Sequence, residues 1–178
     1  MTITLAIDTS TSRTSVAVVD DGVILWSGHR DGATEHGPAL PSLVQEGIKG
    51  FAIKAVVVGM GPGPYTGLRV GIAFAESFAL ARGISVRGVC SLDAIAAQVN
   101  ERDFIVTVDA RRKEVYWARY KDGVRVGEPA VSFPADVAGT SIHADLFPDM
   151  KALVALTRNI TEPIYLRRPD AVATADRT

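Results

Sequence analysis

The chain has 178 residues, with 19 Lys and Arg against 20 Asp and Glu. This length suits one domain or two small lobes with a shared core, and the net charge of −1 excludes a global positive field that would attract nucleic acid. The hydrophobic fraction of 47%, without any run of about 18 apolar residues, is typical of a globular protein and not of a membrane-spanning one.

The single cysteine and the amino-terminal segment bear on the cellular compartment. Cys90 has no partner for an internal disulfide. The first ten residues, MTITLAIDTS, have neither the basic region nor the apolar segment of a secretion signal. We therefore expect a cytoplasmic protein without membrane attachment, and a buried thiol at Cys90.

Strand and helix patterns alternate in the amino-terminal half. Strands are predicted over residues 3–7 and 14–19, and the turn signal Asp21-Gly22 leads into a third strand over 23–28. Three antiparallel strands therefore come first. Periodicity then predicts, in order, a helix over 35–49, a strand over 55–60, a helix over 67–82, a strand over 84–90 and a helix over 91–99. This alternation favours parallel pairing with helical crossovers.

The same order of elements begins again in the second half. Asp8 and Asp109 are 101 positions apart (109 − 8), and the residues Asp21-Gly22-Val23 precede Asp122-Gly123-Val124 by the same distance. This spacing indicates a duplicated βββαβαβα motif in an α/β protein. The later part of the second copy is poor in pattern, with a helix expected only over 149–157. We expect two lobes, the second one reduced, at residues 1–102 and 103–178.

A glycine-rich stretch, residues 59–71 (GMGPGPYTGLRVG), joins a predicted strand to a predicted helix. It has neither the lysine nor the spacing of a Walker-type phosphate loop, and Pro62 and Pro64 remove two backbone N–H groups that such a loop would use. Proline restricts φ and glycine permits unusual φ, so we expect a rigid turn that aims the following helix. Thr66 is predicted to cap that helix.

The helix over 67–82 is apolar on nearly every side, and a helix that is apolar all round is buried all round. Its second cover is either the preceding helix or a partner subunit. We predict that Ala75→Glu or Phe74→Glu prevents pairing with another chain and leaves the monomer folded. The helix has a small-residue seam and a bulky row beside it, which are Gly67, Gly71, Ala75 and Ala79, and Val70, Phe74 and Phe78.

Four motifs resemble those of one family, the bacterial tRNA threonylcarbamoyladenosine biosynthesis proteins TsaB, also called YeaZ. They occur in the order of that family. The resemblance is carried by Ile7-Asp8-Thr9-Ser10, by Gly61-Pro62-Gly63-Pro64-Tyr65-Thr66-Gly67-Leu68-Arg69-Val70-Gly71, by Asp109-Ala110-Arg111-Arg112-Lys113-Glu114-Val115-Tyr116 and by Pro163-Ile164-Tyr165-Leu166-Arg167.

This resemblance implies the two-lobed actin/Hsp70/sugar-kinase-like fold, which is ribonuclease H-like in each lobe. It also implies a non-catalytic subunit that pairs with a catalytic TsaD-like subunit, works with a TsaE-like ATPase, reaches tRNA indirectly and forms a homodimer when alone. Pairing uses the first two helices. The interface implied here consists of Leu40, Leu43, Val44, Gly67, Arg69, Val70, Gly71, Phe74, Ala75, Phe78 and Ala79.

No catalytic residue, metal or cofactor is predicted. The catalytic paralogue resembles a metalloprotein with a His-x-x-x-His pair, whereas here Leu40 follows His36 at that spacing. Thr9 follows Asp8 where the superfamily's phosphate motif has glycine. Binding of a nucleotide between subunits is left as an open alternative. The alternative function is a small ATP-dependent kinase or ATPase of the same fold. A peptidase is disfavoured because no motif supplies a Ser/His/Asp or Cys/His set.

Basic residues are clustered at two places, Arg111-Arg112-Lys113 and Arg167-Arg168. The default interpretation is solvated turn residues. The alternative is a local contact with tRNA phosphates inside an assembled complex.

Overall fold

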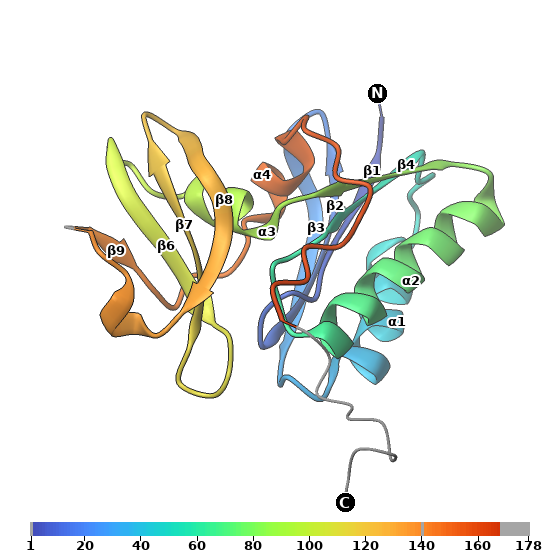
Figure 1. Cartoon of the computed structure of the whole chain (residues 1–178). Helices are drawn as coiled ribbons and strands as arrows, with labels where there is room; N and C mark the ends of the chain where they lie inside the picture. The colour runs from blue at the N-terminus through green and yellow to red at the C-terminus, as the bar shows by residue number, and fades with distance from the viewer. Residues whose placement is uncertain (1, 140, 168–178) are drawn as a thin grey trace, which may run out of the picture.

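Two β-sheets with helices around them form the computed structural model, which describes residues 2–139 and 141–167 (Figure 1). The first sheet has the strand order β3-β2-β1-β4-β5. The first three strands are antiparallel neighbours, and β4 pairs in parallel with both β1 and β5. The strands are β1 (Thr4–Asp8), β2 (Arg13–Asp20), β3 (Val23–Asp31), β4 (Ala55–Gly59) and β5 (Ser85–Val89).

The second sheet repeats the opening of the first. Its order is β8-β7-β6-β9, with antiparallel pairing among β6, β7 and β8. Both hairpins turn through an Asp-Gly pair with positive φ, 44° and 80° at Asp21-Gly22 and 49° and 77° at Asp122-Gly123, as tight hairpins require. The predicted duplication of three strands is confirmed. The strands are β6 (Asp103–Asp109), β7 (Val115–Lys121), β8 (Val124–Ser132) and β9 (Ile142–His143).

The helices form two layers. In Figure 1, α1 (His36–Gly47) and α2 (Tyr65–Arg82) lie on one side of the first sheet, while α3 (Ser91–Ala96) and α4 (Met150–Ala155) lie between the sheets. A short 3-10 turn, Pro134–Asp136, follows β8. Within the described residues, the outer side of the second sheet has no α-helix against it (Figure 1). None of the described helices is both long enough and apolar enough to cross a membrane.

The central strands β1, β2 and β4 are buried on both faces, since they are apolar at nearly every consecutive position, whereas the edge strand β3 is largely exposed. Leu5 and Ile7 of β1 face the cluster formed with α1 and α2. Ala6, between them, faces the other side and packs in a cluster that includes Leu153 of α4. Although α4 follows the second sheet in the sequence, it therefore completes the core of the first.

The segment after α4, residues 156–167, is called here the return segment. It runs back beside the first sheet (Figure 1), where Ile160 N–H donates to Gly88 O at 2.8 Å. Farther along, Ile164 N–H donates to Met60 O at 2.8 Å, in the glycine-rich turn. Ile160 contacts the cores of both sheets, so the return segment connects the two lobes.

Candidate functional site

The Asp8-Thr9-Ser10 turn follows β1 and is sealed inside the protein. Asp8 is only 1% exposed. Its Oδ1 accepts hydrogen bonds from Ser10 N–H at 2.9 Å and from Ser10 Oγ at 2.7 Å, and its Oδ2 accepts one from Ser91 Oγ at 2.6 Å. Burial raises the pKa of Asp8 above its ordinary value, and the serine donors oppose that rise. The carboxylate thus satisfies donors of its own turn and of α3.

Glycine is required where neighbouring backbone approaches this turn. A Cβ at Gly59, the last residue of β4, would collide with the Asp8 carboxylate. A Cβ at Gly63 would collide with the Ser10 carbonyl oxygen. The glycine-rich stretch therefore lets β4 and the start of α2 close over the turn, and it connects a strand to a helix as predicted.

Thr9 locks the turn to α2. Its Oγ1 donates to Gly67 O at 2.7 Å and accepts from Gly71 N–H at 3.2 Å, and a Cβ at Gly71 would overlap that oxygen. Gly67 and Gly71, which form the first half of the small-residue seam, therefore contact the Thr9 turn of the same chain. The prediction that this seam meets a partner subunit is corrected at Gly67 and Gly71, because Thr9 already occupies the space beside them.

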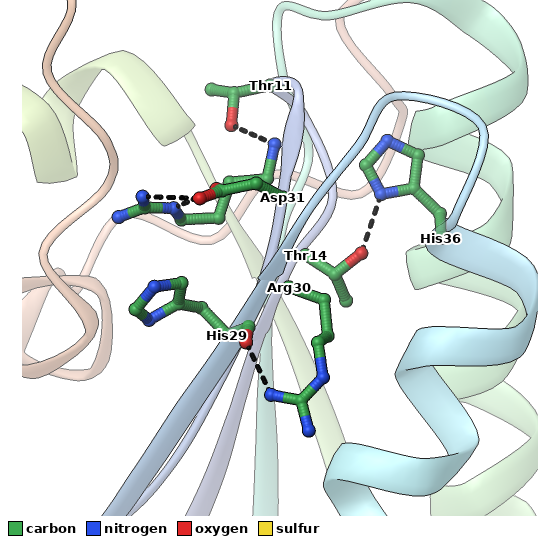
Figure 2. A network of polar contacts seen from close by, with 7 residues as sticks. Thr11, Thr14, His29, Arg30, Asp31 and His36 are labelled. Carbon is green, nitrogen blue, oxygen red and sulfur yellow. Dashed lines mark hydrogen bonds and ion pairs between the residues drawn. The ribbon is translucent and has the colours of Figure 1, made fainter.

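His36 begins α1 and is 5% exposed, as expected of a helix-start residue. Its Nδ1 shares a 2.8 Å hydrogen bond with Thr14 Oγ1 (Figure 2). Burial lowers the pKa of His36, against the opposing effect of the nearby Asp8 charge. Leu40, one turn later, is fully buried in the first core, and among the described residues no three His, Cys, Asp or Glu are grouped to hold a metal ion.

A cleft of about 280 Å³ lies between the lobes, beside the Thr9 turn. The first lobe contributes Thr66 and Gly67 of α2, and the second contributes Asp109 and Arg111. These residues belong to motifs far apart in the sequence, and the fold brings them to one place. Asp109 ends β6 as Asp8 ends β1, and its Oδ1 accepts from Arg111 N–H at 2.9 Å, but Asp109 remains exposed.

The predicted role of Thr66 as a helix cap is wrong. α2 begins at Tyr65, two residues earlier than expected, with Pro64 at the N-cap position and no side-chain capping bond. Proline has the fixed φ that suits a helix entry. Thr66 therefore lies within the first turn and lines the cleft.

Most of the predicted partner interface lies inside the chain itself. α1 covers one flank of α2, which was the simpler of the two alternatives. Ala75 is fully buried in the first core, so the expectation that Ala75→Glu leaves the monomer folded is corrected. The interior members are Leu40, Leu43, Val44, Gly67, Gly71, Ala75 and Ala79, and those with surface exposure are Arg69, Val70, Phe74 and Phe78.

The outer side of α2 is less apolar than its sequence suggested. Ala73, Glu76 and Ser77 are exposed, and Leu80 is 84% exposed. Beside them, the half-buried rings of Phe74 and Phe78 stack with centroids 6.1 Å apart. This surface of α2, comprising Arg69, Val70, Ala73, Phe74, Ser77, Phe78 and Leu80, is called here the α2 surface.

Sequence reasoning missed a polar cluster between α3 and the second sheet. Asp93 Oδ1 accepts from Tyr120 Oη at 2.8 Å and pairs with Arg125 at 3.1 Å. Arg125 is almost fully buried. The neighbouring Cys90 is buried as predicted, and burial raises its pKa to about 12, so the thiol stays protonated. No spacing in the sequence pairs Asp93 with Arg125, which are 32 positions apart.

The duplicated sheets, the helices between them and a cleft lined by strand-end motifs define a two-lobed α/β protein. Residues 30–169 match the family described as TsaD, tRNA N6-adenosine threonylcarbamoyltransferase. The chain belongs to this family and, within it, to the TsaB (YeaZ) group.

Individual relatives are similar to the chain over most of its length. The protein named TsaB of Escherichia coli K12 is 34% identical over 137 residues, which cover 70% of this chain and 58% of that one. An uncharacterized protein of Mycobacterium tuberculosis H37Rv is 43% identical over 196 residues, covering 94% of this chain and 92% of that one. The solved structure of YeaZ from Pseudomonas aeruginosa has a TM-score of 0.74 and 27% identity, covering 87% of this chain and 90% of that one. The chain spans 58% and 56% of the TsaB proteins of E. coli and Bacillus subtilis.

Proposed function

We propose that the chain is a non-catalytic subunit for the synthesis of threonylcarbamoyladenosine in tRNA, and that it pairs with and supports a catalytic TsaD-like subunit. The names of its relatives support the pathway, since several are tRNA threonylcarbamoyladenosine biosynthesis proteins. A TsaE-like ATPase acts through the same complex, and tRNA is the final acceptor. No metal or cofactor is assigned to the chain.

The observation that carries the non-catalytic role is the closure of the Asp8 turn. Both carboxylate oxygens of Asp8 accept hydrogen bonds from within the chain. Thr9 fills the space beside α2 where a superfamily phosphate loop would present bare backbone. A carboxylate held in this way has no open face toward a substrate or a metal ion, so the turn supports the structure and performs no chemistry.

The pairing role is assigned to the α2 surface. The stacked, half-buried rings of Phe74 and Phe78, with exposed positions of α2 beside them, are suited to receive apolar side chains of another helix. Alone, the chain uses the same surface for a homodimer. Because the small-residue seam is filled by the chain's own turn, the contact is made by the bulky row and its exposed neighbours.

Pairing is tested with Ala73→Glu, an exposed position beside Phe74, so that the core is untouched. The variant should remain folded and should elute as a monomer that fails to bind the TsaD-like subunit in size-exclusion chromatography with light scattering. The matched control is Ala52→Glu, an exposed position before β4, which should behave as wild type. Retained pairing in Ala73→Glu would disprove the use of the α2 surface.

Catalysis is tested with Asp8→Asn, which keeps the size of the side chain. In the reconstituted complex, this variant should support threonylcarbamoyladenosine formation to within a few-fold of wild type when the subunits are saturating. The isolated chain should release no ADP from ATP. Turnover of ATP by the chain that disappears in Asp8→Asn would favour the small ATPase or kinase instead.

A further inference from the structure

The return segment brings together residues that lie far apart in the sequence. Arg167 forms an ion pair with Glu114 and its Nη2 donates to Arg111 O at 3.4 Å. Two residues earlier, Tyr165 packs against Tyr65 of α2, with ring centroids 4.9 Å apart. Three separate segments, the first turn of α2, the turn after β6 and the end of the return segment, therefore share one surface.

This surface concentrates positive charge on a chain whose net charge is −1. Arg69 adds a fourth basic position to the turn residues Arg111, Arg112 and Lys113, all of which are exposed. Its guanidinium lies 5.2 Å from the centre of the Tyr65 ring and contacts the Tyr65 hydroxyl. The acidic neighbours are Asp109, Glu114 and Asp145. Glu114 is already paired with Arg167, while Asp109 and Asp145 line the same cleft as Arg111.

The turn holds its basic side chains in an unusual backbone. Arg111, Arg112 and Lys113 all have positive φ, at 63°, 54° and 64°. All three side chains are exposed, and the Nη2 group of Arg167 donates a hydrogen bond to the Arg111 carbonyl oxygen of this turn. Exposed basic side chains and the Tyr65–Tyr165 pair are therefore held close together by contacts between the three segments.

We propose that this surface, consisting of Arg69, Arg111, Lys113, Tyr65 and Tyr165, contacts RNA directly, with phosphates at the basic side chains and an unstacked base on the tyrosines. This inference rests on the proposed function and gives the chain a direct part in holding tRNA. Basic side chains attract any phosphate backbone, and an exposed aromatic face beside them is the means by which proteins bind unpaired bases. Tyr165 is 39% exposed and supplies that face.

Binding is measured with the full chain and a fluorescently labelled, unmodified tRNA transcript, by anisotropy at several salt concentrations. Arg111→Gln with Lys113→Gln removes two charges from an exposed turn. It should weaken binding roughly tenfold near physiological salt and reduce the slope of log affinity against log salt by about 1 to 2. The matched control removes two charges at the opposite end of the first sheet, Lys49→Gln with Lys54→Gln, and should bind as wild type.

The tyrosine is tested separately from charge. Tyr165→Ala should weaken binding about fivefold or more without changing the salt slope, and Tyr165→Phe should restore it because stacking needs only the ring. Equal losses in the control pair and in the Arg111/Lys113 pair would overturn the proposal.

A protein partner with an acidic face is the competing occupant. If the Arg111/Lys113 variant binds tRNA normally but no longer pairs with the TsaD-like subunit in size-exclusion chromatography, the RNA assignment is wrong. Since pairing and RNA binding are measured independently, loss of pairing in Ala73→Glu with intact tRNA binding leaves this proposal standing.

Discussion

Ser91 and Asp8 are 83 positions apart in the sequence, yet the serine hydroxyl donates a 2.6 Å hydrogen bond to Oδ2 of the aspartate. The same serine lies in the first turn of α3, and the aspartate is the last residue of β1. Ser91 N–H also donates to Gly61 O at 2.9 Å. One residue therefore joins the end of a central strand, the glycine-rich turn and the helix that leads to the second lobe.

Ser91→Ala should lower the free energy of unfolding by about 1 to 3 kcal/mol, because a buried carboxylate loses one of its donors. Urea unfolding followed by circular dichroism gives this value. The control is Ser77→Ala on the exposed side of α2, where a change of less than about 0.5 kcal/mol is expected. Equal stability of the two variants would show that the Asp8 network contributes nothing.

Gly71→Ala should destabilise the chain by about 1 to 3 kcal/mol, since its new methyl group overlaps the Thr9 hydroxyl. In a Thr9→Ala background the same change should cost less, so a double-mutant cycle should show coupling between the two sites. Gly37 in α1 is the control because its added Cβ would meet no neighbour. Gly37→Ala should be neutral or stabilising, by up to about 1 kcal/mol.

Arg125→Met should cost about 3 to 5 kcal/mol because it leaves the carboxylate of Asp93 without its cation at a buried joint between the lobes. The comparison pair is Arg102 and Asp122, whose side chains are 90% and 52% exposed. Arg102→Met should change the unfolding free energy by less than about 1 kcal/mol. The free energies of unfolding of both variants are measured by thermal or urea unfolding. A small loss in Arg125→Met would show that this cluster contributes little to stability.

His36 should make stability depend on pH in a defined direction. Burial lowers its pKa in the folded chain, so between its unfolded value, near 6.5, and its lower folded value the unfolded state binds more protons. The contribution of His36 to the free energy of unfolding is fully present above about pH 6.5 and is lost as the pH falls through the pKa of the folded chain. The raised pKa of Asp8 acts in the opposite direction.

The His36 contribution is isolated by comparison with His36→Asn, whose side chain can still bond to Thr14. Urea midpoints measured from pH 7.5 to pH 5 should fall more steeply for wild type than for the variant. Parallel curves would show that His36 does not titrate in this range.

Local signals in the sequence were sufficient for the order of elements. Asp-Gly turns and β-branched runs depend only on neighbouring residues, and the structure has both hairpins at those turns. The rigid glycine-rich connection followed from the same local chemistry. The predicted helix cap at Thr66 was wrong, because Pro64 and not Thr66 stands at the N-cap position of α2.

Local signals in the sequence did not indicate which segment packs against each apolar side of a helix. Periodicity indicates that α2 has apolar sides, but it does not say whether Thr9 or another chain fills the notch at Gly71, since these residues are 62 positions apart. The Asp93–Arg125 pair and the Tyr65–Tyr165 contact could not be predicted for the same reason. Both depend on how two lobes are placed, and no pattern within one segment encodes that placement.

The return of α4 to the first sheet has a consequence for dividing the polypeptide. A fragment that stopped at residue 102 would keep all five strands of the first sheet but would expose Ala6, Ala17 and Val57, which Leu153 now covers. The carboxyl-terminal fragment would carry that missing cover. We therefore expect that neither piece folds on its own and that the two recover native structure by complementation when they are mixed.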